Sequence, residues 1–187
     1  MYWGFDAFVG RWLSKAEHYN CNDLSQLFDK FFTLYVVYNA LYDEAFDRLI
    51  SAKRVKAIDR AEERRAIAHV ATFLDSDQLA PQLRLHKKEL SQVEKIVQGK
   101  IFYFSVTKPP RKPNFKRDQQ LCSQLRSQDS TEFCESVLTF IYRTRCNMFH
   151  GKKGYDSEQE IVLKPMNVFL RTVIDMLCSK LKAQDSG

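Results

Sequence analysis

Apolar residues recur at steps of three and four along most of this 187-residue chain. That spacing predicts helices that bury one face. The longest run begins after Asp23 and continues to Leu49 without an internal Gly or Pro. Asp23 is suited to cap this helix, and Gln26 follows three residues later, as in a capping box. We therefore expect a long central helix with one buried face.

Further helices are predicted by the same periodicity on both sides of this one. Pro81 and Pro165 are placed to open helices, because proline is favoured in a first turn, and Gly99 and Gly151 are placed to end them. The predicted helices cover a short opening amphipathic segment, residues 55–75, Pro81–Val97, Asp129–His150 and Pro165–Leu181. No repeat is evident, so the pattern predicts one all-α domain over residues 1–187.

Two segments between these helices are not expected to be helical. Lys100–Val106 is short, aromatic and β-branched, but a lone strand would have no partner, so we predict an extended connector. Residues 108–118 form a basic loop that contains three prolines and five basic residues before its first acid, Asp118. This loop is either a solvated surface segment or a strap against a nucleic-acid backbone, with Phe115 stacking on a base. The strap would use Arg111, Lys112, Phe115, Lys116 and Arg117.

Composition and charge narrow the class of protein only slightly. The chain is 44% hydrophobic and 28% charged, as in globular proteins, and its net charge of +6 is compatible with a polyanionic partner. Its five cysteines include no CxxC pair, which argues against a disulfide framework or a zinc site. The sequence shows no signal peptide and no apolar run of about 20 residues. We expect a cytoplasmic protein without a metal or a membrane segment.

The segment around Arg145 carries the candidate chemistry. On a helical wheel, Arg145 falls within the apolar arc of its helix, where a charge is costly unless it is paired. An internal ion pair or a snorkelling side chain is the structural explanation. His150 ends the same helix before Gly151, where the helix dipole and the neighbouring Lys152 and Lys153 act on its pKa in opposite directions. A histidine that titrates near neutrality suits general acid–base catalysis.

Two segments resemble a known superfamily. Ile141–Gly151 resembles the Arg-x4–6-His signature of the HEPN superfamily, and Tyr35–Tyr42 is similar to the aromatic-Asn-Ala-Leu-Tyr segment on the first core helix of several HEPN families. The resemblance implies an up-and-down helical bundle that forms a homodimer, so that two motifs face one cleft. It also implies a metal-independent endoribonuclease of the toxin or anti-phage type, without a cofactor. An antitoxin or a defence protein is then a further expected partner.

The resemblance also implies roles for individual residues. His150 would act as general base on a ribose 2′-hydroxyl or as acid to the leaving 5′-oxygen, and Arg145 would neutralise charge on the phosphoryl oxygens. The products would be a 2′,3′-cyclic phosphate and a 5′-hydroxyl. The sequence departs from the signature at Cys146, where a polar residue is common, although Asn147 follows it. Tyr155 is too far from the histidine to match the tyrosine that some members carry.

Three further residues, Arg143, Asn147 and Asn39, are candidates for accessory roles. On an ideal helix, Arg145 and His150 lie about 140° apart, whereas Arg143 and His150 share a face. Either Arg145 works with a histidine that the end of the helix displaces, or both arginines contribute, for example across a dimer. We rank Arg145 first and keep Arg143 as a second phosphate-binding residue, with Asn147 and Asn39 as accessories. Two other functions stay open: an RNA- or nucleotide-binding HEPN module without catalysis, and a structural helical domain that buries Arg145 in an ion pair. No P-loop, nucleophile elbow or zinc spacing indicates another enzyme class.

Overall fold

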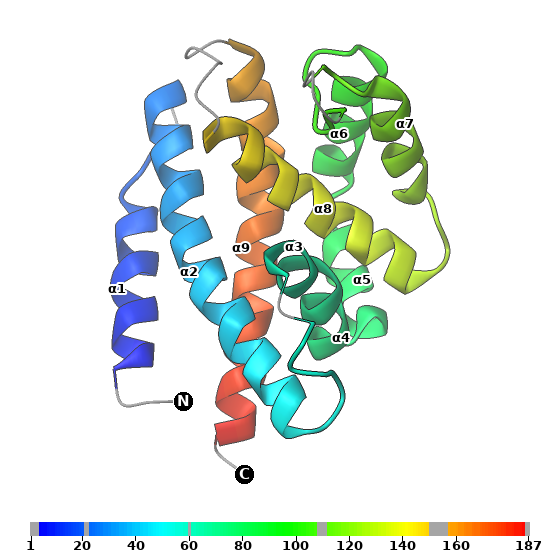
Figure 1. Cartoon of the computed structure of the whole chain (residues 1–187). Coiled ribbons are helices and arrows are strands. Elements are labelled where there is room, and N and C mark those ends of the chain that lie inside the picture. Colours follow the sequence, from blue (N-terminus) through cyan, green and yellow to red (C-terminus); the bar gives the residue numbers. More distant parts are fainter. Residues whose placement is uncertain (1–3, 21–22, 60, 108–111, 150–156, 186–187) are drawn as a thin grey trace.

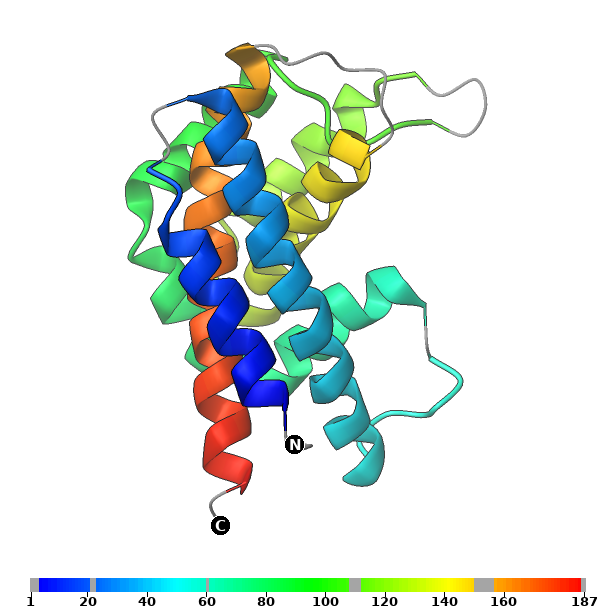
Figure 2. The same cartoon turned by 90° about the vertical axis from the view of Figure 1, so that its left-hand side faces the viewer.

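The computed structural model describes residues 4–20, 23–59, 61–107, 112–149 and 157–185, and over these residues the protein is all-α (Figure 1). Two long helices, α2 (Leu24–Ser51) and α9 (Ser157–Asp185), pack along each other. Helix α1 (Phe5–Glu17) runs antiparallel to α2 on its outer side (Figures 1 and 2). No strand forms in the described residues, where Val106 and Pro113 make only an isolated β-bridge.

The start of α2 confirms the predicted cap. Asp23 Oδ1 accepts a hydrogen bond from the Gln26 backbone N–H at 2.8 Å. The Gln26 side chain does not complete a capping box; its Oε1 accepts from the Asn20 N–H at 2.9 Å, so it ties the preceding turn to the helix. The apolar face predicted from the sequence is buried along the whole helix, as Phe31, Leu41 and Leu49 illustrate.

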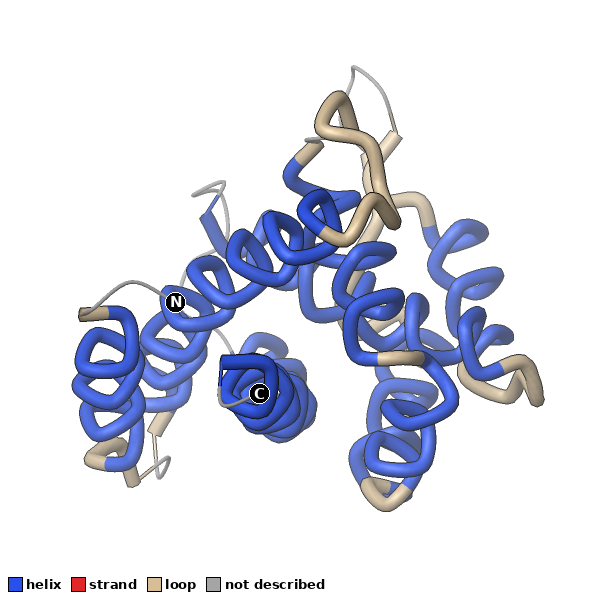
Figure 3. The backbone as a smooth tube through the Cα atoms, turned by 90° about the horizontal axis from the view of Figure 1, so that it is seen from below, coloured by secondary structure: helices blue, strands red, loops and turns tan. Residues whose placement is uncertain are grey.

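Helix α9 runs parallel to α2, and contacts at both ends show this register. Near one end, Asn167 Nδ2 donates to the Leu27 carbonyl at 3.1 Å. Near the other, Arg48 Nη2 lies 2.6 Å from Asp185 Oδ1. Seen from below, α9 lies between the pair of α1 and α2 on one side and the shorter helices on the other (Figure 3).

The prediction that Pro165 opens the last helix is wrong, because α9 begins at Ser157 and Pro165 lies inside it. Proline there leaves the carbonyl four residues earlier without its helical donor. The turn that precedes Pro165 is nevertheless buried, through Val162 and Leu163, and Pro165 itself is buried. Apolar burial of these side chains offsets the lost hydrogen bond.

The predicted helix over residues 55–75 is confirmed only in its second part. Residues 52–59 form turns, and the helical part begins with α3 (Glu62–Arg64), continues as a π-helical turn, η1 (Arg65–His69), and ends as α4 (Val70–Leu74). Lys53 has a φ of 55°, a left-handed conformation that ends α2. Ile58, which fitted the apolar pattern, is 87% exposed. A single apolar residue in a charged stretch therefore did not establish a buried face.

The predicted helix from Pro81 to Val97 is two helices, α5 (Ser76–Arg84) and α6 (Lys87–Gln98). Pro81 lies inside α5 rather than at its start, and Asp75 caps that helix by accepting from the Asp77 N–H at 3.2 Å. Leu85, at the break between the two helices, is 72% exposed. Because the chain breaks between α5 and α6, α6 can pack against α9 independently of α5.

The connector at Lys100–Val106 is not helical, as predicted, but it begins with a turn at Lys100 (φ 52°) and bends at Ile101 and Phe102 instead of being extended throughout. The basic loop ends earlier than expected. Helix α7 (Phe115–Gln124) includes residues that were assigned to the loop. Asn114 caps it by accepting from the Arg117 N–H at 3.1 Å. The last proline of the segment is Pro113, so nothing after it opposes helix formation.

Helix α8 (Ser130–Phe149) confirms the predicted helix and crosses obliquely in front of α9 (Figure 1). Its cap is the expected one, since Asp129 Oδ1 accepts from the Glu132 N–H at 2.8 Å. The buried apolar residues of the longer helices form one contiguous core. Among the described residues, no helix has the length and apolarity that a membrane crossing needs.

Candidate functional site

Arg145 lies on the side of α8 that faces α2 and α3. The centre of its guanidinium is 5.5 Å from the centre of the Tyr35 ring, a cation–π distance. Its Nη1 is 3.3 Å from Glu62 Oε1, and the side chains of Arg145 and Glu62 are 29% and 39% exposed. The arginine that interrupts the apolar stripe is therefore half-buried and paired, and solvent still reaches it.

Asn39 belongs to the same group of side chains. The Tyr42 hydroxyl donates to Asn39 Oδ1 and lies 3.4 Å from Glu62 Oε1, so Glu62 links Arg145 to Tyr42 and through it to Asn39. Asn39 is exposed. We call Tyr35, Asn39, Tyr42, Glu62 and Arg145 the Arg145 cluster. It joins the two segments that carry the HEPN resemblance, which lie far apart in the sequence.

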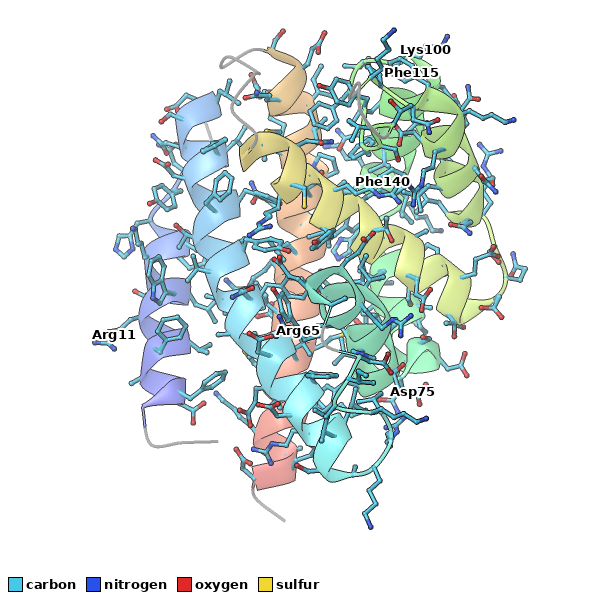
Figure 4. The ribbon with its side chains drawn as sticks, in the orientation of Figure 1. Arg11, Arg65, Asp75, Lys100, Phe115 and Phe140 are labelled. Atoms are coloured by element: carbon cyan, nitrogen blue, oxygen red, sulfur yellow. The ribbon has the colours of Figure 1, made fainter. Side chains whose placement is uncertain are left out.

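A second arginine borders the cluster. Arg65, in η1, bonds to Asp43 through Nη1, and its guanidinium lies 5.7 Å from the centre of the Tyr42 ring. Figure 4 shows Arg65 close to α2, in front of α9. The sequence did not single out Glu62 or Arg65, because both stood in a charged run within an expected solvated helix. Only the packing of η1 against α2 and α8 gives them these partners.

The charges in the cluster are those of Arg145 and Glu62. Burial acts to lower the pKa of Arg145, but Cys146, Glu62 and Tyr35 outweigh it, and the pKa is raised above its usual value. Burial, with the neighbouring tyrosines, raises the pKa of Tyr35. Burial, with Glu62 and Asp43, likewise raises the pKa of Tyr42. Both tyrosines are therefore neutral at physiological pH and act as aromatic surfaces and hydroxyl groups, not as bases.

Arg143 and Asn147 lie on a different side of α8 and do not join the cluster. Arg143 Nη1 donates to Ser105 Oγ at 2.6 Å. Asn147 Nδ2 donates to the backbone carbonyls of Tyr103 and Phe104 at 2.9 and 3.1 Å. Both side chains thus hold the connector against α8. The structure separates these two predicted accessories from Arg145 and Asn39.

Asp118 completes the network around Arg143, and the sequence did not indicate it as more than the first acid after the basic segment. It is fully buried, and its Oδ2 accepts from the Phe104 N–H at 2.9 Å. Burial raises the pKa of Asp118, while Ser105, the Phe104 N–H and Arg143 act in the opposite direction. A buried carboxylate close to an arginine, with the Ser105 hydroxyl shared between them, is a structural arrangement.

The predicted basic strap is only partly described. Lys112 is exposed, and Lys116 and Arg117 are exposed on the first turn of α7. Phe115 is half-buried, and Lys100 Nζ lies 5.8 Å from the centre of its ring; the two side chains are side by side in Figure 4. Phe115 therefore already has a cation on its ring, so stacking on a base would replace that contact.

Several predicted site residues lie outside the described residues. They are His150, Lys152 and Lys153 after α8, and Arg111 in the basic segment. The described part of α8 ends at Phe149, the residue before His150 in the chain. The chemistry that the described residues supply is therefore a half-exposed guanidinium beside two tyrosines, an amide and a carboxylate. In the described part of the chain, no group of His, Cys, Asp and Glu side chains is arranged to hold a metal ion.

Comparison with known proteins found no matching family model, no similar curated protein and no similar solved structure. The HEPN resemblance therefore rests on the residues of the two segments alone. The ribonuclease activity that the resemblance implies is therefore a proposal for this chain.

Proposed function

We propose that this protein is a metal-independent endoribonuclease of the HEPN type, of the toxin or anti-phage class, and that it acts as a homodimer. The observation that carries the proposal is the Arg145 cluster. It brings Arg145, near the end of α8, together with Asn39 and Tyr42 of α2. The cluster therefore contains residues from both segments that resemble the superfamily.

The proposed reaction uses the chain's own side chains for proton transfer and charge stabilisation. His150 takes the proton of the ribose 2′-hydroxyl, whose oxygen attacks the adjacent phosphorus. Arg145 neutralises the charge that develops on the phosphoryl oxygens. The bond from phosphorus to the 5′-oxygen breaks, and that oxygen is protonated. The products are a 2′,3′-cyclic phosphate and a 5′-hydroxyl, and a second copy of the chain would place a second motif in the same cleft.

Cleavage of RNA in EDTA tests this proposal directly. We expect the purified protein to cut single-stranded RNA with excess EDTA present, because proton transfer and charge neutralisation here need no metal. The products should resist direct 3′-end ligation until the cyclic phosphate is removed, and their 5′ ends should accept phosphate from a kinase. Cleavage only with a divalent ion, or products with 5′-phosphates, would contradict the mechanism.

Glu62 should oppose RNA binding, because its carboxylate occupies the position beside Arg145 that a phosphate would take. We expect Glu62→Gln to strengthen RNA binding by roughly three- to tenfold, the scale of one half-exposed ionic contact. The measurement is fluorescence anisotropy of a labelled RNA, made in the His150→Ala background so that the RNA is not cut. Glu63→Gln is the matched control, since Glu63 is the next residue and its charge acts on Arg143 and Tyr142, whereas that of Glu62 acts on Arg145. Equal or weaker binding after Glu62→Gln would argue against a phosphate at Arg145.

An RNA-binding module without catalysis is the second candidate. The exposed cations Lys112, Lys116 and Arg117 on one segment favour it, because they suit contacts with a phosphate backbone. This candidate predicts binding that weakens steeply with salt and no turnover in any buffer. An antitoxin or a defence protein would be a partner under either function.

A further inference from the structure

A pocket with a volume of about 530 Å³ lies between α2, α6 and α9, and Glu17 of α1 lines its edge. The volume falls within the range of sites for small molecules. None of its lining residues belongs to the Arg145 cluster, and α8 contributes none of them. The pocket is therefore separate from the proposed RNA site.

Basic side chains outnumber acidic ones in the lining of this pocket. Four are basic, Lys30, Lys88, Lys164 and Arg171, and two are acidic, Glu17 and Glu89. Arg171 is paired with Glu17 and Asp175, and Lys164 with Glu160. Among the described residues, Lys30 and Lys88 have no carboxylate partner. Two ammonium groups on the pocket wall are thus available for an anion.

The start of α6 adds to the positive potential of the pocket. His86 stands at the N-cap position, and its side chain does not cap the helix. Lys88 and Glu89, in the first turn, line the pocket. The first-turn N–H groups of a helix favour an anion, both by direct hydrogen bonding and through the helix dipole.

One acceptor in the pocket wall lacks a donor from the chain. Asn167 is only 6% exposed, and its amide nitrogen donates to the Leu27 carbonyl, whereas its Oδ1 is buried without a partner. Beside it, Thr172 Oγ1 lies 2.8 Å from His86 Nε2 and 3.1 Å from the Val168 carbonyl oxygen, so these polar groups bond to one another.

We propose that this pocket binds a small hydroxylated organic anion of the sugar-phosphate or sugar-acid class. The phosphate or carboxylate lies between Lys30, Lys88 and the start of α6. Hydroxyl groups of the ligand donate to Glu89, and a donor that reaches Asn167 satisfies its amide oxygen, which otherwise carries the cost of an unmade hydrogen bond. The carbon skeleton of the ligand contacts Leu27 and Val168.

Calorimetric titration of the whole chain tests the proposal with four probes: glucose 6-phosphate, gluconate, glucose and inorganic phosphate. We expect glucose 6-phosphate or gluconate to bind with one site per chain, and whichever binds more tightly identifies the anion as phosphate or carboxylate. Glucose lacks the anion and inorganic phosphate lacks the hydroxylated body, so each should bind at least about tenfold more weakly.

Variants at neighbouring lysines separate this pocket from general positive charge. The double variant Lys30→Ala/Lys88→Ala should weaken binding by about tenfold or more. The matched control Lys87→Ala/Lys95→Ala removes two exposed lysines of α6 that do not line the pocket, and it should bind like the unchanged protein. The proposal is overturned if neither hydroxylated anion binds at millimolar concentration, if inorganic phosphate binds equally well, or if the two double variants behave alike.

Discussion

Replacing His150 with Ala should lower the rate of RNA cleavage by about 10²- to 10⁴-fold, the usual contribution of a general acid or base. Histidine is the side chain whose unperturbed pKa lies close to neutral pH, which suits it to proton transfer. Arg145 stays charged and the cluster tyrosines stay neutral, because their pKa values are raised. Neither Arg145 nor these two tyrosines can therefore act as the base in place of the lost imidazole. The measurement is the single-turnover rate on a labelled RNA in EDTA.

The matched control for this variant is His18→Ala. His18 is exposed at the end of α1, and its ring bonds only to the Ser14 carbonyl, within the same helix. Its removal should leave the cleavage rate unchanged. Thermal unfolding of both variants verifies that each is folded. A His150→Ala protein that cuts RNA as fast as the unchanged protein would exclude His150 as the catalytic base.

Replacing Arg145 with Ala should lower the cleavage rate by about 10²- to 10³-fold, the effect of removing one preorganised donor to a developing oxyanion. The same change should cost only about 1 to 2 kcal/mol of unfolding free energy. The ion pair with Glu62 is half-exposed, and such pairs contribute about 0–1 kcal/mol. The contact with the Tyr35 ring adds about 0.5–1 kcal/mol. Denaturant unfolding and cleavage assays on the same preparation give both values.

Arg143→Ala is the comparison that separates catalysis from structure, because Arg143 lies two residues away on the same helix. It bonds to Ser105 beside the buried Asp118, so its loss should cost about 2 kcal/mol or more. The rate of the protein that remains folded should change little. If Arg145→Ala unfolds the protein and Arg143→Ala does not, Arg145 is a structural residue. The catalytic role of Arg145, and with it the ribonuclease proposal, is then wrong.

Long periodic segments and their caps were predictable because their determinants are local. Helix α2 begins at the predicted Asp23 cap, and α8 begins after the predicted Asp129 cap. In both helices, the apolar positions at steps of three and four are the buried ones. The predictions of helix starts failed where tertiary packing outweighed a local preference of the sequence. Pro165 and Pro81 suit a first turn, yet both lie inside helices whose preceding residues gain from burial.

The residues of the candidate site were also predictable only in part. Arg145 was identifiable as a charge on an apolar stripe, and Asn39 by its place in a recognisable segment. Arg143 and Asn147 were predicted as accessory residues of the same site, but they face the connector that contains Ser105. Since side chains two positions apart on a helix point to nearly opposite sides, only the neighbouring elements decide which side faces a site.

By itself, the sequence determined that the chain is helical, where α2 and α8 begin, and which residue types the candidate chemistry would use. These properties follow from hydrophobic periodicity and from hydrogen bonds between residues a few positions apart. Only the tertiary structure decided that Glu62 pairs with Arg145, that Tyr42 joins them to Asn39, and that Lys30 and Lys88 share a pocket. These contacts join residues distant in sequence, and they depend on how α2, η1, α6, α8 and α9 pack around a common core.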